Sequence, residues 1–489
     1  MSRLKQQGIK AFIWDFSGKL ANQGVSFVIS IFLARLLEPA EFGLIAMIMV
    51  VIGMTSVFTD VGLGSALIQR KRVLPIHYAS VFYFNVFVSL LLTLITYYSA
   101  GLIAQFYQND ALLPLVQVMS LSFVINGFSS IQSTKLRKEL NYAILTKAGF
   151  IAGLIGGVIG VTIAFQGFGV WSLVVQTLVS GVVYNLLLWS WSQWKPSWLF
   201  SVKALKQLWG FGFRMFLAGL LDAVFTRLDY MIIGNLFMPA TLGYFQRAKS
   251  LNLLVVQYSS GSLMSVLFPV LAQVKNDLPR FRKIAIKMMG IISFIVFLLL
   301  GGLYLLSEEL IILLFGEKWL PSVHFFQILV FSGFAYPVSA LLVNILSSRG
   351  NSKGFLRLEV FKKSLVSINL LVLYFFGINS YLYGLMVTSV FGLSLNIFFA
   401  TREIKSTFFS FLEPIVDQAI IVILSVVSAV YLISFMDMPS EILFFVEGFL
   451  FTILYLIFSW IFKTKSYYSF LDQIISKHKI TLLENTKAL

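Results

Sequence analysis

The sequence predicts an all-α polytopic membrane protein of about 14 transmembrane helices, with two six-helix lobes related by a parallel pseudo-two-fold repeat plus two C-terminal helices. First, 58% of the 489 residues are hydrophobic and 12% are charged, whereas a soluble domain carries about 25% charged residues. Second, the apolar residues form runs of about 20 residues, long enough to cross a bilayer. Third, Lys and Arg gather in alternate connections between these runs.

Fourteen apolar segments account for the predicted spans. In chain order they cover residues 11–36, 43–68, 77–103, 113–133, 144–165, 170–192, 207–236, 243–268, 285–306, 323–347, 363–377, 381–400, 414–436 and 442–462. The first segment is long and is not followed by a small-residue cleavage site. We therefore expect it to stay in the membrane as a helix.

The basic residues predict the orientation of these spans. With the N-terminus in the cytoplasm, the inward-facing segments hold 29 of the 37 Lys and Arg residues, and the outward-facing loops hold one, Lys318. This is the positive-inside pattern, and it predicts cytoplasmic N- and C-termini. The net charge of +16 is then explained by contact with anionic lipid, so we expect no nucleic-acid partner.

Two pairs of similar strings indicate an internal repeat. WDFSGKLANQG (14–24) and WGFGFRMFLAG (209–219) open the first and seventh spans, and LEPAEFGL (37–44) and FMPATLGY (237–244) follow those spans. Spans 1–6 and 7–12 are therefore predicted to be two copies of one unit, in the same membrane orientation. Two lobes around a central cleft are a transporter architecture.

The repeat predicts the division of the chain. It places an N-terminal six-helix lobe at 1–200, a C-terminal six-helix lobe at 201–405, two extra transmembrane helices at 406–462 and a cytoplasmic tail at 463–489.

Four basic residues within the spans are predicted to bind the substrate. A charge at the centre of a lone helix costs about 2.5–3.5 kcal/mol, so charges kept there usually have a function. Lys19 and Arg214 occupy the same step of the two repeats, and we expect both to face one central cavity. Arg227 and Arg247 are further candidates, Arg247 at the outer mouth. Such cations suit a phosphate-containing substrate.

Three acidic residues are candidates for ion coupling or charge balance. Asp222 and Asp229 follow Arg214 by 8 and 15 residues, which places all three on one helical face. Asp60 in the second span is expected to balance Lys19. A network of neutralising ion pairs in the core would explain the same stripe, and snorkelling would explain charges near span ends, including Arg247.

Several motifs of enzymes are missing from the sequence. The chain has no Cys, and its three His residues lie at span ends or in the tail. Neither GxxxxGK[ST] nor H-E-x-x-H occurs. We therefore expect no catalytic residue, no metal and no cofactor, apart from a coupling ion, H⁺ or Na⁺.

Five strings carry a resemblance to a known family. They are ARLLEPAEFGL (34–44), DVGLGSALIQRK (60–71), KLRKELNY (135–142), VLFPVLAQV (266–274) and LFGEKW (314–319). With them the chain resembles the bacterial polysaccharide transporter (Wzx-type) flippases of the multidrug/oligosaccharidyl-lipid/polysaccharide exporter superfamily. It is most similar to the branch that includes the colanic acid exporter.

The resemblance implies a substrate and a setting. The substrate would be an undecaprenyl-diphosphate-linked oligosaccharide, moved from the cytoplasmic to the periplasmic leaflet of the bacterial inner membrane by alternating access. The products would serve exopolysaccharide, capsule or O-antigen assembly. The implied partners are membrane lipids, a polysaccharide polymerase and a chain-length regulator. The last two spans resemble helices proposed to cradle the lipid tail in the lipid II flippase.

Three other functions stay open at this point. A multidrug or cation antiporter of the same superfamily would be dominated by acids and aromatic residues, whereas the spans here hold seven cations and six acids. A membrane glycosyl- or acyltransferase would need a buried base or a metal site. A non-transporting component of a polysaccharide assembly complex would need no cavity.

Overall fold

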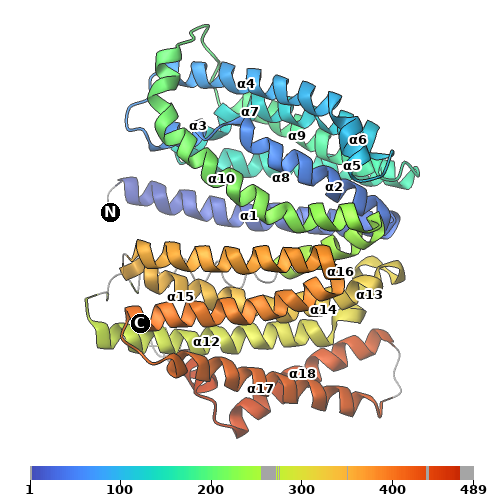
Figure 1. The fold of residues 1–489 in the computed structure, drawn as a ribbon, viewed down its shortest axis with the longest axis vertical. Helices are drawn as coiled ribbons and strands as arrows, with labels where there is room; N and C mark the ends of the chain where they lie inside the picture. Colours follow the sequence, from blue (N-terminus) through green and yellow to red (C-terminus); the bar gives the residue numbers. More distant parts are fainter. Residues whose placement is uncertain are drawn as a thin grey trace, which may run out of the picture. The chain divides into compact units, whose positions relative to one another are not determined.

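The computed structural model describes residues 3–254, 271, 274, 276–349, 351–436 and 440–473. The chain divides into two compact units, Met1–Gln246 (unit 1) and Arg247–Leu489 (unit 2) (Figure 1). Unit 1 contains α1 (Arg3–Leu36), α2 (Pro39–Thr55), the 3-10 helix η1 (Ser56–Thr59), α3 (Leu63–Gln69), α4 (Pro75–Tyr98), α5 (Ala100–Phe106), α6 (Leu112–Met119), α7 (Leu121–Lys138), α8 (Tyr142–Phe165), α9 (Trp171–Trp191) and α10 (Val202–Leu236). Unit 2 contains α12 (Leu278–Leu305), α13 (Ser307–Phe315), η2 (Glu317–Trp319), α14 (Pro321–Gly333), α15 (Ala335–Arg349), α16 (Ser352–Glu403), α17 (Phe408–Ile433) and α18 (Ser440–Ile461).

The predicted all-α membrane fold is confirmed. Among the described residues, 11 helices are long and apolar enough to cross a membrane. The predicted number of 14 is not confirmed. α1 is not among the 11, since polar residues occupy its first half, and most of the predicted span 243–268 lies outside the described residues.

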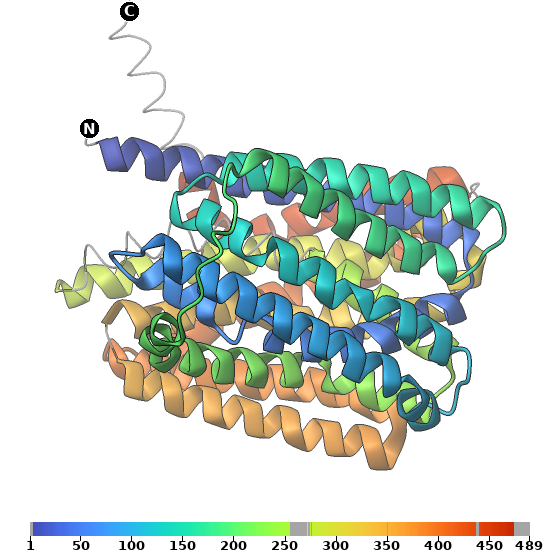
Figure 2. The ribbon, with the colours of Figure 1, turned by 90° about the horizontal axis from the view of Figure 1, so that it is seen from above.

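A row of glycines lets α8 pack closely between α1 and α9. A Cβ on Gly157 would overlap Ile29 of α1, and a Cβ on Gly160 would lie 2.8 Å from the Cβ of Gln176 of α9. Small residues at such spacing allow helix backbones to approach each other in a membrane. As a result α1 runs beside α8 in unit 1 (Figure 2).

The second predicted span is broken rather than continuous. α2 ends at Thr55, η1 follows, and α3 begins at Leu63 after a turn. In this turn Val61 and Gly62 have left-handed backbone, with φ of 44° and 71°. A break of this kind at membrane depth needs protein or polar groups around it, because its backbone groups cannot bond to lipid.

α10 packs antiparallel along α2 and α3, and it covers the break between them. A Cβ on Gly234 of α10 would lie 3.1 Å from Cγ of Met47, and a Cβ on Gly212 would lie 3.3 Å from the carbonyl of Gly62. In the reverse direction, a Cβ on Gly62 would overlap the carbonyl oxygen of Gly212. The two backbones therefore touch at the break, with no side chain between them.

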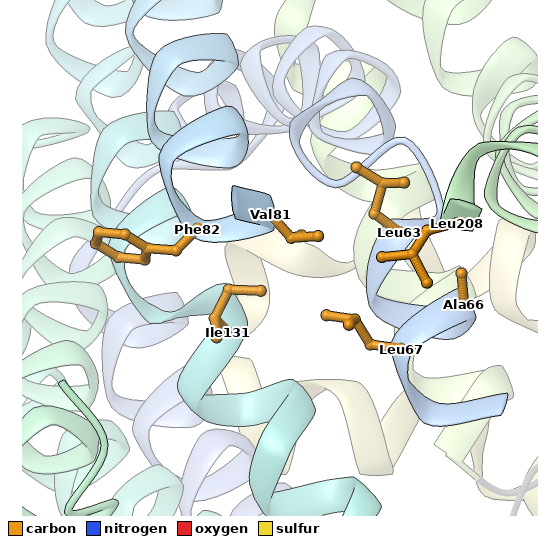
Figure 3. Close-up of a cluster of buried hydrophobic side chains, with 7 residues drawn as sticks. All are labelled: Leu63, Ala66, Leu67, Val81, Phe82, Ile131 and Leu208. Atoms are coloured by element: carbon orange, nitrogen blue, oxygen red, sulfur yellow. The ribbon is translucent and has the colours of Figure 1, made fainter. Parts of the chain in front are cut away.

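An apolar cluster holds α3 in place beside this contact. It joins α3 to α4, α7 and α10 (Figure 3). Its buried members are Leu63, Ala66, Leu67, Val81, Phe82, Ile131 and Leu208. Because each of these side chains is at most 4% exposed, the short helix is fixed from three sides.

The second pair of repeated strings meets in unit 1. A Cβ on Gly43 would overlap the carbonyl oxygen of Pro239, and a Cβ on Gly243 would overlap the carbonyl oxygen of Pro39. The contact is reciprocal, as a two-fold relation between the strings requires. Repeat-related positions therefore lie against each other.

α16 of unit 2 folds back on itself. Gly377 within it has φ of 84° and ψ of 179°, which is not helical. Nδ2 of Asn369 donates to the carbonyl oxygen of Tyr381 at 3.2 Å, whereas 12 residues of straight helix would separate them by about 18 Å. The chain therefore reverses at Gly377, where the sequence predicts one span to end before the next begins.

The other helices of unit 2 pack around α12. It lies between the α14–α16 group and the α17–α18 pair (Figure 1). The hydroxyl of buried Tyr455 on α18 lies 2.9 Å from the carbonyl oxygen of Phe294 on α12 and 2.6 Å from Oε1 of Gln418 on α17. This polar contact ties the two last helices to α12.

The boundary between the two units lies between Gln246 and Arg247, after α10. In the sequence, α10 begins the second repeat. The boundaries predicted from the repeat, 1–200, 201–405, 406–462 and 463–489, stay predictions.

Substitution of Gly62 tests the contact at the break. We expect Gly62→Ala to lower the free energy of unfolding by at least about 1–2 kcal/mol, because a left-handed φ disfavours Cβ and the methyl group meets the Gly212 carbonyl. The thermal unfolding midpoint of the purified protein measures this loss. Gly210→Ala on α10 is the control, since a Cβ there meets no atom within 4 Å. Equal midpoints for the two variants would contradict the close packing.

Candidate functional site

Lys19 lies exposed on α1 and pairs with an acid on the same helix. Its side chain is 71% exposed, and its Nζ lies 2.6 Å from Oδ2 of Asp15, one turn earlier. Nearby, Nζ of Lys147 on α8 lies 5.6 Å from the ring centre of Trp14. The start of α1 thus gathers two cations, of which Lys147 was not among the predicted site residues.

The charged residues predicted to share one face of α10 differ in their exposure. Arg214 and Asp222 are exposed, whereas Asp229 is only 6% exposed. The Oδ1 of Asp229 accepts from the backbone N–H of Tyr230 at 2.9 Å. Arg214 and Asp222 are therefore accessible to a ligand, and Asp229 lies within the packed part of unit 1.

Arg227 lies half-buried against α2. Its guanidinium occupies the space that a Cβ on Gly53 would fill. Its Nε is buried and has no hydrogen-bond partner among the described residues. A buried donor without an acceptor usually costs about 1–3 kcal/mol, so this position calls for explanation.

Asp60 caps the broken span and is not paired with Lys19. Its carboxylate accepts from the backbone N–H of Gly64 at 2.9 and 3.0 Å, and from Nδ2 of Asn85 at 3.1 Å. Nδ2 of Asn85 also donates to Oγ of Ser130 at 3.0 Å. A carboxylate at the N-terminus of α3 is favoured by the helix dipole, so Asp60 has a structural role here.

Lys138 caps the other end of α3. Its Nζ donates to the carbonyl oxygens of Leu67, Ile68 and Arg70 at 2.7, 3.0 and 2.5 Å. Sequence analysis did not predict this role, although Lys138 lies in the string KLRKELNY and its targets lie in DVGLGSALIQRK. α3 thus carries an acid at its start and a cation at its end, as the helix dipole favours.

Arg247 is buried in unit 2 rather than lining an open mouth. It is 7% exposed, and its guanidinium carbon lies 4.7 Å from the ring centre of Phe315 and 5.2 Å from that of Trp319. Both rings belong to the string LFGEKW. Stacking on aromatic faces is a favourable use of a desolvated Arg, and it explains the position without a ligand.

The accessible charged groups of unit 1 define what the site can bind. Lys19 and Arg214 offer ammonium and guanidinium donors to an anion, and Asp222 offers a carboxylate. In the part of the chain that the structure describes, no group of three or more His, Asp or Glu residues is placed to hold a metal. The two exposed cations suit binding of an anion.

Comparisons with known proteins agree on one family. The family described as "Polysaccharide biosynthesis protein" matches residues 32–324. The succinoglycan biosynthesis transport protein ExoT of Rhizobium meliloti (strain 1021) is 26% identical over 331 residues, 67% of this chain and 64% of that protein. The lipopolysaccharide biosynthesis protein WzxC of Escherichia coli (strain K12) is 22% identical over 361 residues, 73% of each protein.

A solved structure shares the fold. The lipid II flippase MurJ, in an inward closed conformation, superposes with a TM-score of 0.71 at 17% identity, covering 93% of this chain and 98% of that chain. At such low identity the match shows the fold alone.

Removal of the cation that caps α3 tests its structural role. We expect Lys138→Met to lower the free energy of unfolding by about 1–3 kcal/mol, because three carbonyl oxygens lose their charged donor. The thermal unfolding midpoint measures the effect. Lys135→Met is the control on the same helix: it removes a partly exposed pair with Glu139 at 3.7 Å, worth at most about 1 kcal/mol. A larger loss of stability in Lys135→Met than in Lys138→Met would refute the structural role of Lys138.

Proposed function

Because the chain belongs to the polysaccharide biosynthesis protein family, we propose that it is a flippase that moves undecaprenyl-diphosphate-linked oligosaccharides from the cytoplasmic to the periplasmic leaflet. The transport protein among its relatives and its fold support transport. Moving a diphosphate and sugars through hydrocarbon unaided is prohibitive, so such a step needs a protein.

One observation carries the proposal: repeat-related cations lie exposed on two helices, and the predicted orientation places both toward the cytoplasmic side. Lys19 precedes the outer end of α1 at Leu36 by about 26 Å of helix, and Arg214 precedes the outer end of α10 at Leu236 by about 33 Å. Since the hydrocarbon core is about 30 Å thick, Lys19 would lie in its inner part and Arg214 at its inner boundary. This is the level at which a lipid-linked substrate arrives from cytoplasmic synthesis.

The two cations bind the diphosphate in this mechanism. Arg214 binds phosphate oxygens through its planar fork, and Lys19 binds as a point charge once it leaves Asp15. The sugars pass through an aqueous cavity, while the lipid tail stays in the membrane. Alternating access of the lobes then opens the cavity outward.

An acid on the same helix as Arg214 couples the cycle to an ion gradient. Asp222 is exposed on the same helix as Arg214 and lies about 12 Å along it. Binding of H⁺ or Na⁺ there would cancel its charge as the phosphate moves past. Asp60 and Asp229, which are held in packed surroundings, balance charge.

The setting follows from the same proposal. The protein is a multi-pass transporter of the bacterial inner membrane with cytoplasmic termini and no enzymatic step of its own. It passes its product to a polysaccharide polymerase and a chain-length regulator. α17 and α18 contact the lipid tail.

A leaflet-accessibility assay tests this function. Purified protein in vesicles receives a fluorescent undecaprenyl-diphosphate oligosaccharide, and a quencher reports the fraction in each leaflet. We expect Lys19→Ala and Arg214→Ala each to slow flipping by about 10- to 100-fold, because a charged hydrogen bond contributes about 1.5–3 kcal/mol. Lys203→Ala, at the exposed start of α10, is the control and should flip at the wild-type rate.

Two results would contradict the proposal. If both cation variants flip as fast as wild type, the cations do not bind the diphosphate. If wild type does not flip the lipid but exchanges organic cations for H⁺ or Na⁺, the protein is an antiporter.

A further inference from the structure

The connection between α9 and α10 exposes large apolar side chains. In this linker, residues 192–201, Gln193 has left-handed backbone with φ of 51°, which stops α9. Trp198 is 95% exposed, and Leu199 and Phe200 are 52% and 56% exposed. Three consecutive large apolar side chains are unfavourable in water, so the linker needs a partner that covers them.

The linker runs across the start of α4 instead of projecting away from it (Figure 2). The backbone N–H of Ser201 donates to Oγ of Ser80 at 2.8 Å. The ring of Trp198 stacks with that of Tyr83, with 6.4 Å between the ring centres. Because α4 begins at Pro75, these contacts lie about 8 and 12 Å along the helix. The linker is therefore level with the first turns of a helix that spans the membrane.

Two features keep the linker out of the hydrocarbon itself. Within the described part of unit 1, the backbone groups of residues 195–200 form no hydrogen bond with other backbone groups. Such backbone groups are not found exposed to hydrocarbon. In addition, Lys195 in the linker and Lys206 in the second turn of α10 are exposed. The headgroup region offers water and phosphate to these polar groups and hydrocarbon to the rings beside them.

The level of the linker favours the bilayer over a soluble protein as its partner. A soluble protein binds groups that project into the cytoplasm, whereas the exposed ring of Trp198 lies beside a membrane-spanning helix. Trp is enriched at membrane–water interfaces because its ring is amphipathic. The neighbouring Lys residues are complementary to anionic phospholipid, which gives the cytoplasmic leaflet its negative surface potential. The predicted orientation assigns that leaflet to this end of α4.

We propose that the linker is an interfacial anchor, which inserts its apolar side chains into the cytoplasmic leaflet at headgroup level and binds anionic phospholipid through Lys195 and Lys206. The anchor fixes the start of α10, which follows the linker directly. It binds the phospholipid of the bilayer and uses none of the groups assigned to the transported substrate. The anchor therefore does not depend on which substrate the protein moves.

A fluorescent label on the linker tests the anchor. The chain has no native cysteine, so Leu199→Cys carries a single bimane label and leaves Trp198 in place. The full-length protein is placed in vesicles of phosphatidylcholine and phosphatidylglycerol. We expect lipid that is spin-labelled near the headgroup to quench this label at least about twofold more than a label at Lys71→Cys. Lys71 is the matched control, since it is exposed in the connection that precedes α4.

Two spin-labelled lipids compared on the same label test the preference for charge. We expect phosphatidylglycerol to quench the Leu199→Cys label at least about twofold more than phosphatidylcholine does, because Lys195 and Lys206 attract the anionic headgroup. The double substitution Lys195→Gln and Lys206→Gln should remove most of this preference. Thermal unfolding midpoints equal to that of wild type verify that the variants are folded.

Three results would overturn the anchor. Equal lipid quenching of the two labels, with iodide in the water quenching both alike, would place the linker in water. Protection of the Leu199→Cys label from both lipid and iodide would show that protein covers the linker, as in a dimer. A preference for phosphatidylglycerol that survives the double substitution would exclude the two Lys residues as its cause. None of these results depends on flipping, which the leaflet-accessibility assay measures separately.

Discussion

The backbone contact between α10 and the broken α2–α3 segment is the constraint on which the account of unit 1 depends. Gly62 and Gly212 let the two elements touch without side chains between them, at the point where the chain turns through left-handed backbone between η1 and α3. The contact fixes α10 along its length. It therefore sets where the side chains of Arg214 and Arg227 lie, on different sides of that helix.

The charged residues of the spans fall into two groups, those held by neighbouring protein groups and those that are exposed. Asp60 and Lys138 bind the two ends of α3, and the guanidinium of Arg247 lies over the rings of Phe315 and Trp319. These groups stabilise the fold. Lys19, Arg214 and Asp222 are exposed and are the groups that the proposed function assigns to substrate and ion binding, so a charge in a span indicates function only after its neighbours are known.

Much of the fold could be predicted from the sequence. Hydrophobic runs of about 20 residues predict the membrane-spanning helices, and basic loops predict their orientation. The break at Gly377 falls between two spans that the sequence predicts. The family match confirms the resemblance that the quoted strings indicated. The break before α3 could not be predicted, since its turn is apolar enough to extend a span. The pairing of Lys19 with Asp15 is an i,i+4 contact within one helix, which periodicity could have revealed, whereas the bond from Asp60 to the start of α3 depends on the break in the span.

The most direct test of the account locks α10 to η1, the 3-10 helix that follows α2. The chain has no native cysteine, so Val57→Cys with Gly219→Cys adds a single pair. A Cβ on Gly219 would lie 3.5 Å from Cγ1 of Val57, which is within the reach of a disulfide. The measurement is the flipping rate of the oxidised double variant in vesicles. The account predicts that the disulfide forms and that the rate stays at the wild-type value, with and without reductant. Failure to form the disulfide, or flipping only after reduction, would contradict it.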